Sequence, residues 1–195
     1  MAVNERSAVP WARRPGVRIG AVVAVAIAAA FVVWLVVRNN DSNTASTGQT
    51  QTVQAVAPVA ATAERLRALS VDIGRPIYWV GPAANTTYEL RRTSQDQIYV
   101  RYLPHGVPVG TGKASYTIVG TYPVQNAHGV LEDLAKKNGE SSFTAPREGL
   151  AVYSTSRPTN VYLAFPDSNE QIEVFDPSAD RARELIASGQ VTPVR

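Results

Sequence analysis

The side chains that most often carry catalysis or bind metals are scarce in this chain. It has no cysteine and two histidines, His105 and His128. The missing thiols exclude disulfides, thiolate nucleophiles and cysteine-bound zinc. Neither histidine has a third ligand at metal-site spacing, and His128 falls early in an expected helix, at the edge of its apolar stripe. We therefore expect structural or solvent-exposed histidines, no metal ion and no cofactor.

Two segments resemble ligand-binding loops without meeting their requirements. In GVPVGTGKAS, 106–115, a phosphate-binding loop would need a glycine in place of Val107 and a serine or threonine in place of Ala114. In DSNEQIE, 167–173, the spacing is that of a calcium loop, but Ile172 occupies the position that needs glycine. A hairpin turn explains the second segment better, and neither segment predicts a bound ion or nucleotide.

Carboxylates at helical spacing raise the alternative of a hydrolase. Asp180 and Glu184 are four residues apart, and a pair of carboxylates can do acid–base work on a glycoside. Arg181 and Arg183 alternate with them, which is more typical of a solvated helix surface. The chain also lacks the G-x-S-x-G nucleophile motif. No catalytic residue is predicted, and a membrane-tethered cell-envelope hydrolase remains the alternative function.

The strongest local pattern is a β-hairpin with tyrosine and arginine on one face. In TYELRRTSQDQIYVRYLP, 87–104, two alternating runs flank a polar turn, and a three-residue turn at 94–96 places Leu90 opposite Val100 on the inner face. The outer face then carries Glu89, Arg91, Tyr99 and Arg101. Aromatic residues and arginine are enriched at protein interfaces, so these four side chains form a candidate interaction face. The alternative is an ordinary solvated sheet face.

The order of the remaining elements predicts an α+β domain. A strand within 115–124 and a helix capped by Asn126 follow the hairpin. A second hairpin at 150–166, a strand at 171–177 and a helix before Gly189 repeat this order. We expect an antiparallel sheet with helices on one face.

The repeated order predicts a duplicated β-β-β-α unit, unless short amphipathic strands are alike by chance. The match between the two hairpins pairs Leu90 with Val152, Ile98 with Val161, Tyr99 with Tyr162 and Val100 with Leu163. The segment QIEVFDP, 171–177, then follows as a strand, as TIVGTYP, 117–123, follows the first hairpin.

A long apolar segment sets the expected location. It begins at Ile19, ends at Val37 and contains no charged residue, and about 20 apolar residues are enough for a helix to cross a bilayer. Trp34 lies one turn from its outer end, where an indole suits the interface. Residues 1–38 hold five arginines and one glutamate, and the next basic residue is Arg65. The positive-inside rule therefore places the N-terminus in the cytoplasm and the C-terminal bulk outside.

Four regions follow: a short basic cytoplasmic tail (1–18), a transmembrane helix (19–37), a flexible linker (38–62) and an extracytoplasmic α+β domain (63–195). A cleaved signal peptide is the alternative for the apolar segment, which is longer than the usual apolar region of such a peptide. In residues 39–195, 14 basic side chains are balanced by 15 acidic ones. This balance does not predict a nucleic-acid partner.

The segments GRPIYWVGP, 74–82, YELRRTSQDQIYVRYLP, 88–104, and FDPSADRARELIASG, 175–189, carry a family resemblance. With them the chain resembles uncharacterised, single-pass membrane-anchored proteins of high-GC Gram-positive bacteria. The resemblance implies a location in the bacterial envelope and no specific activity. We expect the N-terminal helix to contact the lipid bilayer, and the outer domain to bind another envelope component, either a protein or a cell-wall glycan.

Overall fold

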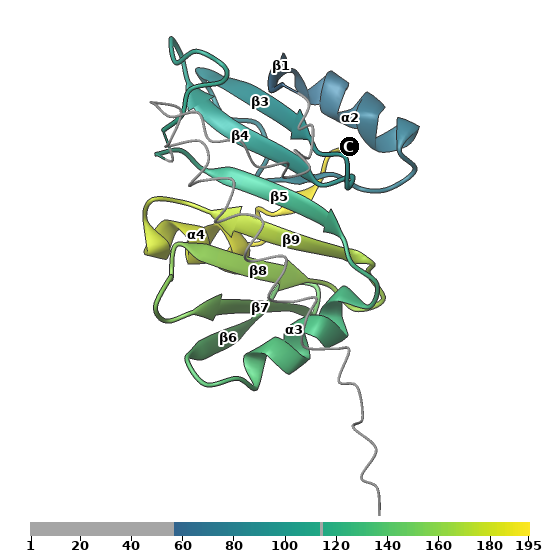
Figure 1. Ribbon diagram of the computed structural model, residues 1–195, viewed down its shortest axis with the longest axis vertical. Coiled ribbons are helices and arrows are strands. Elements are labelled where there is room, and N and C mark those ends of the chain that lie inside the picture. Colours follow the sequence, from purple (N-terminus) through teal and green to yellow (C-terminus); the bar gives the residue numbers. More distant parts are fainter. Residues whose placement is uncertain (1–56, 114) are drawn as a thin grey trace, which may run out of the picture.

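The structure, a computed structural model, describes residues 57–113 and 115–195 (Figure 1). The predicted cytoplasmic tail, the predicted transmembrane helix and most of the predicted linker lie outside these residues. Within the described residues, no helix has the length and apolar character needed to cross a membrane. The membrane location therefore stays a prediction from the sequence.

An antiparallel sheet of eight strands organises the described residues, in the spatial order β1-β3-β4-β5-β9-β8-β7-β6 (Figure 1). Its strands are β1 (Val59–Ala61), β3 (Thr86–Arg92), β4 (Ile98–Pro104), β5 (Ile118–Pro123), β6 (Glu140–Ala145), β7 (Gly149–Ser154), β8 (Asn160–Ala164) and β9 (Glu170–Phe175). Two short strands, β2 (Tyr78–Trp79) and β10 (Thr192–Pro193), pair with each other in a separate small sheet. The mixed α+β class with a large antiparallel sheet is confirmed.

Three helices pack on the large sheet in the described part of the chain: α2 (Ala63–Asp72), α3 (Ala127–Ala135) and α4 (Ala179–Ala187). Each begins at a residue whose side chain accepts a hydrogen bond from a backbone N–H three positions on: Thr62 from Arg65, Asn126 from Gly129, and Ser178 from Arg181. These bonds satisfy N–H groups that have no partner within the helix. The predicted cap at Asn126 and the predicted stop at Gly189, which has a φ of 75°, are confirmed.

The predicted hairpin is confirmed as β3 and β4, and its register is the predicted one. Leu90 pairs with Val100, and Arg91 pairs with Tyr99. The turn is closed by the N–H of Thr93, which donates to the carbonyl of Gln97 at 3.0 Å. The last residue of the turn has a φ of 58°, the left-handed conformation typical of three-residue hairpin loops.

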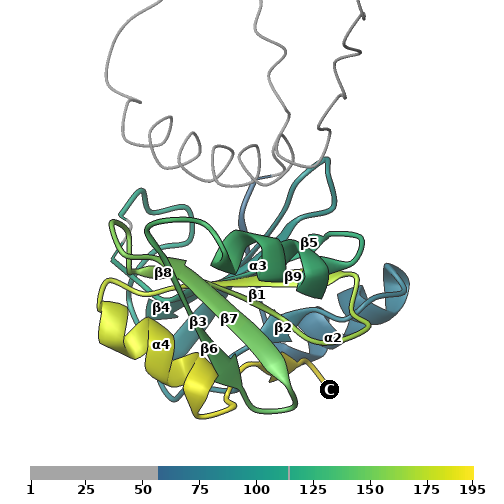
Figure 2. The ribbon, with the colours of Figure 1, turned by 90° about the horizontal axis from the view of Figure 1, so that it is seen from below.

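The helices cover both faces of the sheet, so the prediction that they share one face is wrong. Helices α2 and α4 pack on one face, and α3 packs on the other (Figure 2). The reason lies in strands β7 and β8, which are apolar on both sides. Ala151 and Leu163 contribute to the cluster under α4, whereas Val152 and Ala164 contribute to the cluster under α3. A strand that is apolar on both faces needs cover on both faces.

The strand order is symmetric about the contact between β5 and β9. The meander β3-β4-β5 lies on one side of this contact, and the meander β7-β8-β9 lies on the other. The residue-by-residue match between the two hairpins nevertheless fails in the first of their two strands. Val100 pairs with Leu90 and Val119, and its counterpart Leu163 pairs with Ala151 and Ile172. Leu90 therefore corresponds to Ala151, one residue away from its sequence match, Val152. A shift of one residue turns every side chain to the opposite face.

The structured domain begins before the predicted boundary at residue 63. Residues Val59–Ala61, which the sequence places in the linker, form strand β1 and pair with β3. This strand is short and exposed, and it occupies one edge of the large sheet. Its pairing fixes the point at which the N-terminal part of the chain joins the domain.

Candidate functional site

The structure buries the charged pair of the predicted interaction face. Glu89 and Arg101 are each 3% exposed, and Arg101 Nη1 lies 3.3 Å from Glu89 Oε1. The loop that follows β4 covers them. The N–H of Gly110 donates to Glu89 Oε2 at 2.6 Å, and Arg101 donates to the carbonyls of Thr111, at 2.7 Å, and Lys113. The pair therefore fastens a loop to the sheet and does not face solvent.

The other two residues of the predicted face are also enclosed. Tyr99 is 9% exposed, and burial raises the pKa of its hydroxyl to about 12. Its ring meets the ring of Tyr122 edge to face, with the centroids 5.7 Å apart, and its hydroxyl donates to Gln97 at 3.2 Å. Arg91 is partly buried, and burial lowers the pKa of its guanidinium. The alternation placed all four residues on one side correctly, but this side is covered by the loop after β4 and by a second hydrophobic cluster that includes Tyr99.

A buried carboxylate lies beside this face, at the centre of the sheet, and sequence reasoning missed it. Glu173 on β9 is 2% exposed. The hydroxyl of Tyr122 donates to its Oε2, and the Nδ2 of Asn160 donates to its Oε1 at 2.5 Å. Gly120, which pairs with Glu173, makes room for this contact, because a Cβ there would lie 2.6 Å from the Tyr122 hydroxyl.

The surroundings of Glu173 favour its neutral form. Burial raises the pKa of the Glu173 carboxyl, while hydrogen bonds from Tyr122 and Asn160 act in the opposite direction. Burial also raises the pKa of Tyr122 well above its ordinary value, and the nearby Glu173 adds to the effect. A closed group of this kind stabilises one packing of the sheet. The signal that could have found it is a glutamate inside the otherwise apolar strand QIEVF.

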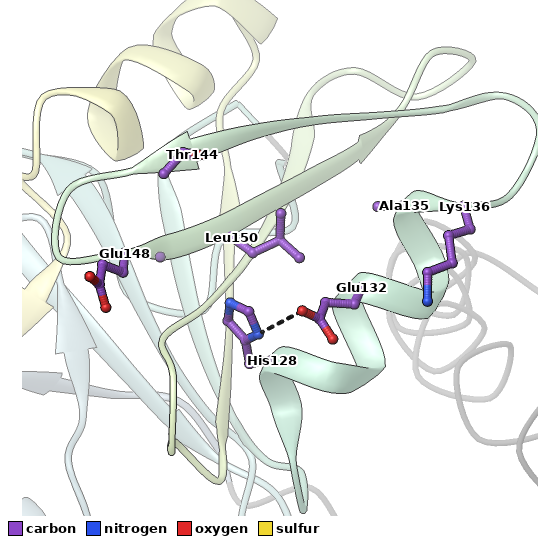
Figure 3. A pocket seen from close by; sticks show the side chains of 8 residues that line it. His128, Glu132, Ala135, Lys136, Thr144, Glu148 and Leu150 are labelled. Carbon is purple, nitrogen blue, oxygen red and sulfur yellow. Dashed lines mark ion pairs between the residues drawn. The ribbon is translucent and has the colours of Figure 1, made fainter.

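An open pocket of about 520 Å³ lies on the α3 side of the sheet, between α3 and the β6–β7 hairpin (Figure 3). Helix α3 contributes His128, Glu132 and Ala135, its C-cap residue is Lys136, and the hairpin contributes Thr144, Glu148, Gly149 and Leu150. Thr144 and Leu150 pair across the hairpin and so lie on the same face of the sheet. Of the features in the described residues, this pocket is the best candidate for a binding site, because it is a hollow bordered by both charged and apolar side chains.

The charges of the pocket are unevenly paired. His128 Nδ1 lies 3.6 Å from Glu132 Oε1, one helical turn away on α3. Lys136 Nζ contacts Asp133, which does not line the pocket, at 3.0 Å. In contrast, the Glu148 carboxylate makes no ion pair or side-chain hydrogen bond within residues 57–113 and 115–195. The pocket thus presents two carboxylates, one of them unpaired, and a lysine whose charge is shared between Glu132 and Asp133.

Comparison of the chain with protein-family models, with curated proteins and with solved structures finds no match to any of them. The lining residues are therefore the basis for any inference about what the pocket binds.

The turn between β6 and β7 positions Glu148. Arg147 and Glu148 both have positive φ angles, 62° and 58°, which are uncommon for residues other than glycine. The neighbouring side chain is held in place: Arg147 donates to the carbonyl of Val191 at 2.7 Å and lies over the ring of Phe165 at 4.3 Å. These contacts anchor the turn from the opposite side, so Arg147 does not neutralise the carboxylate of Glu148.

Only one of the two histidines lines the pocket. His128 lines the pocket and is partly exposed, whereas His105 lies exposed in the loop after β4. In the described part of the chain, no group of three or more histidine, cysteine, aspartate or glutamate residues could hold a metal ion. His128, Glu132 and Glu148 therefore do not form a set of metal ligands. The sequence did not reveal the pocket, because the polar segment ESSFTA gives a weak strand signal and β6 was not predicted.

Proposed function

We propose that the protein is a single-pass membrane protein whose C-terminal domain lies outside the cytoplasm and binds another component of the cell envelope in the pocket between α3 and the β6–β7 hairpin. The apolar segment that begins at Ile19, the basic tail before it and the resemblance to bacterial membrane-anchored proteins support the location. The pocket, with its open polar rim, is the observation that supports binding.

The pocket is a better binding site than the tyrosine–arginine face. A docking partner for Tyr99 and Arg101 would have to displace the loop held by Glu89 and Arg101, because these side chains are buried in the folded domain. The pocket needs no such rearrangement. Its rim residues Glu132, Lys136 and Thr144 are exposed, and they lie on α3, at the C-cap of α3 and on β6.

Photo-crosslinking in living cells tests this proposal. A photoreactive amino acid replaces Thr144 at the rim, and a matched variant carries it at Val71, which is 78% exposed on α2 and lies outside the pocket. We expect a discrete adduct from position 144 and none from position 71, and mass spectrometry then identifies the partner. A folded chain that forms no adduct at position 144 contradicts the proposal, as does the same adduct at both positions.

The hydrolase alternative has one supporting observation, the His128–Glu132 pair inside the pocket. An imidazole oriented by a carboxylate can act as a general base, and such contacts are often loose without substrate. The full chain in detergent micelles, incubated with purified cell wall, distinguishes the two functions. Release of fragments by the wild type and not by His128→Asn would show that the protein is a hydrolase rather than a binding protein. Retention on the wall without release supports binding.

A further inference from the structure

The two glutamates that line the pocket indicate the class of ligand that fits it. We infer that it receives a primary ammonium group on an aliphatic stem, as in a lysine side chain of an extended peptide. This inference rests on the proposed role of the pocket in binding and names what it binds.

The argument begins with the carboxylates. Figure 3 shows Glu148 and Glu132 on either side of His128, so two acidic groups from different elements border the same hollow. Glu132 lies 3.6 Å from the imidazole of His128 and also interacts electrostatically with Lys136, whereas Glu148 has no charged partner within the described residues. The ammonium group of Lys136 is 3.0 Å from Asp133, which does not line the pocket, so its charge is shared between Asp133 and Glu132 and leaves Glu148 uncompensated. A cation entering here therefore finds uncompensated negative charge.

The residues that line the pocket favour an organic cation over a bare metal ion. No three acidic or histidine side chains in the described ranges converge closely enough to hold a metal. An ammonium group needs no such convergence, because it has three donors that can reach separate acceptors. The aliphatic side chains of Leu150 and Ala135 line the same hollow and offer an apolar wall for a stem of methylene groups.

The neighbouring sheet edge indicates a peptide as the carrier of that group. Strand β6 is the last strand of the large sheet and pairs only with β7 among the described strands. An edge of this kind can accept an extended chain by backbone hydrogen bonds. Side chains of an added strand alternate between faces. Every second one would lie on the side of Thr144, where the pocket opens.

Titration of the full chain in detergent micelles with capped tripeptides tests the inference. The probes are Ala-Lys-Ala and its uncharged analogue Ala-norleucine-Ala, and cadaverine serves as the isolated amine. We expect Ala-Lys-Ala to bind more tightly than the norleucine peptide. Glu148→Gln and Glu132→Gln should each weaken its binding about twofold to fivefold, as for exposed ion pairs. Lys136→Gln should strengthen it, because a like charge is removed.

The control is Glu64→Gln, which removes an exposed carboxylate from α2, outside the pocket, and should leave binding unchanged. Equal affinity for the lysine and norleucine peptides overturns the inference, as does an affinity that neither glutamate variant alters. Cadaverine binding without any gain from the peptide backbone overturns the role of the β6 edge. If the adduct at Thr144 forms in cells while the lysine peptide does not bind, the pocket binds a different ligand, and only this inference fails.

Discussion

Glu89 and Arg101 face each other across β3 and β4 as an ion pair, with Arg101 Nη1 3.3 Å from Glu89 Oε1 and both side chains 3% exposed. The same two groups bind three backbone groups of the loop after β4, those of Gly110, Thr111 and Lys113. A surface pair of this kind would contribute little to stability. Here, each partner also satisfies backbone groups, so the pair and the loop depend on each other.

Arg101→Met should destabilise the protein by about 3–5 kcal/mol, because it leaves the buried carboxylate of Glu89 without its cation. Urea unfolding of the full chain in detergent micelles, followed by circular dichroism, gives this value. The loop should also lose its attachment. Hydrogen exchange of the peptide that covers residues 105–113 should accelerate, while exchange in α4 stays unchanged.

The double variant Glu89→Leu/Arg101→Met separates charge from loop attachment. Removing both charges should recover part of the lost stability. The hydrogen bonds that joined Glu89 to the N–H of Gly110 and Arg101 to the carbonyl of Thr111 are still absent, so loop exchange should stay fast. Slow exchange of the loop in Arg101→Met would show that the loop is held by other contacts.

Gly120→Ala should destabilise the centre of the sheet by about 1–3 kcal/mol, since a Cβ would lie 2.6 Å from the Tyr122 hydroxyl and 2.8 Å from its Cζ. The ring would have to leave Glu173, its hydrogen-bond partner. Urea unfolding of both single variants and of Gly120→Ala/Tyr122→Ala measures the coupling. We expect the double variant to be less destabilised than the sum of the two, because the clash needs the ring. Strict additivity would contradict this contact.

The stability of the protein should depend on pH through Glu173. Burial raises the pKa of its carboxyl in the folded protein above the ordinary 4.5. The folded state therefore holds this proton more tightly than the unfolded chain, and the free energy of unfolding falls as pH rises from 4.5 through the folded-state pKa. The contribution is fully present below the unfolded-state value. Glu173→Gln removes it, so wild type minus variant should be larger at about pH 4 than at about pH 8.

Urea unfolding of both proteins across this range provides the measurement. Burial also raises the pKa of Glu170 and Glu140, and these residues are present in both proteins. Their contributions cancel in the difference. A difference that stays constant with pH would mean that Glu173 titrates alike in the folded and unfolded chains.

The features that the sequence predicted correctly are local. The β3–β4 register follows from two alternating runs and a three-residue turn, which lie within one short segment. The cap at Asn126 likewise depends on a bond to a residue three positions away. Such features need no knowledge of how distant elements pack.

The features that the sequence did not predict are set by distant contacts. Tyr99 is buried because β5 and β9 bring Tyr122 and other members of its cluster beside it. Alternation identifies the two faces of a strand but not what covers each face. The pocket likewise joins His128 to Glu148 across two elements, and one of them, β6, has a polar sequence with little strand character.

Glu148→Gly should separate stability from binding. Glu148 has a φ of 58°, a left-handed conformation that costs residues other than glycine about 1 kcal/mol. Glycine adopts it without strain, so we expect the free energy of unfolding to rise by about 0.5–1 kcal/mol, after the entropy of the unfolded chain is counted. Binding of Ala-Lys-Ala should fall at the same time. Glu148→Asn, which tolerates this conformation, should keep wild-type stability and lose the same binding. A less stable Glu148→Gly would contradict the assigned backbone conformation.

The predicted topology can be tested with single cysteines, because the natural chain has none. Val71→Cys lies on α2, at a position that is 78% exposed, and Ser7→Cys lies in the predicted cytoplasmic tail. In intact cells, a membrane-impermeant maleimide should label Val71→Cys and spare Ser7→Cys, since the arginines before Ile19 hold the N-terminus inside. Permeabilised cells should label both, and the cysteine-free wild type reports background. Labelling of Ser7→Cys in intact cells would show that the N-terminus lies outside, which contradicts the predicted orientation. Loss of the tail from the membrane-bound protein, seen by intact mass, would instead mean that the apolar segment is a cleaved signal peptide.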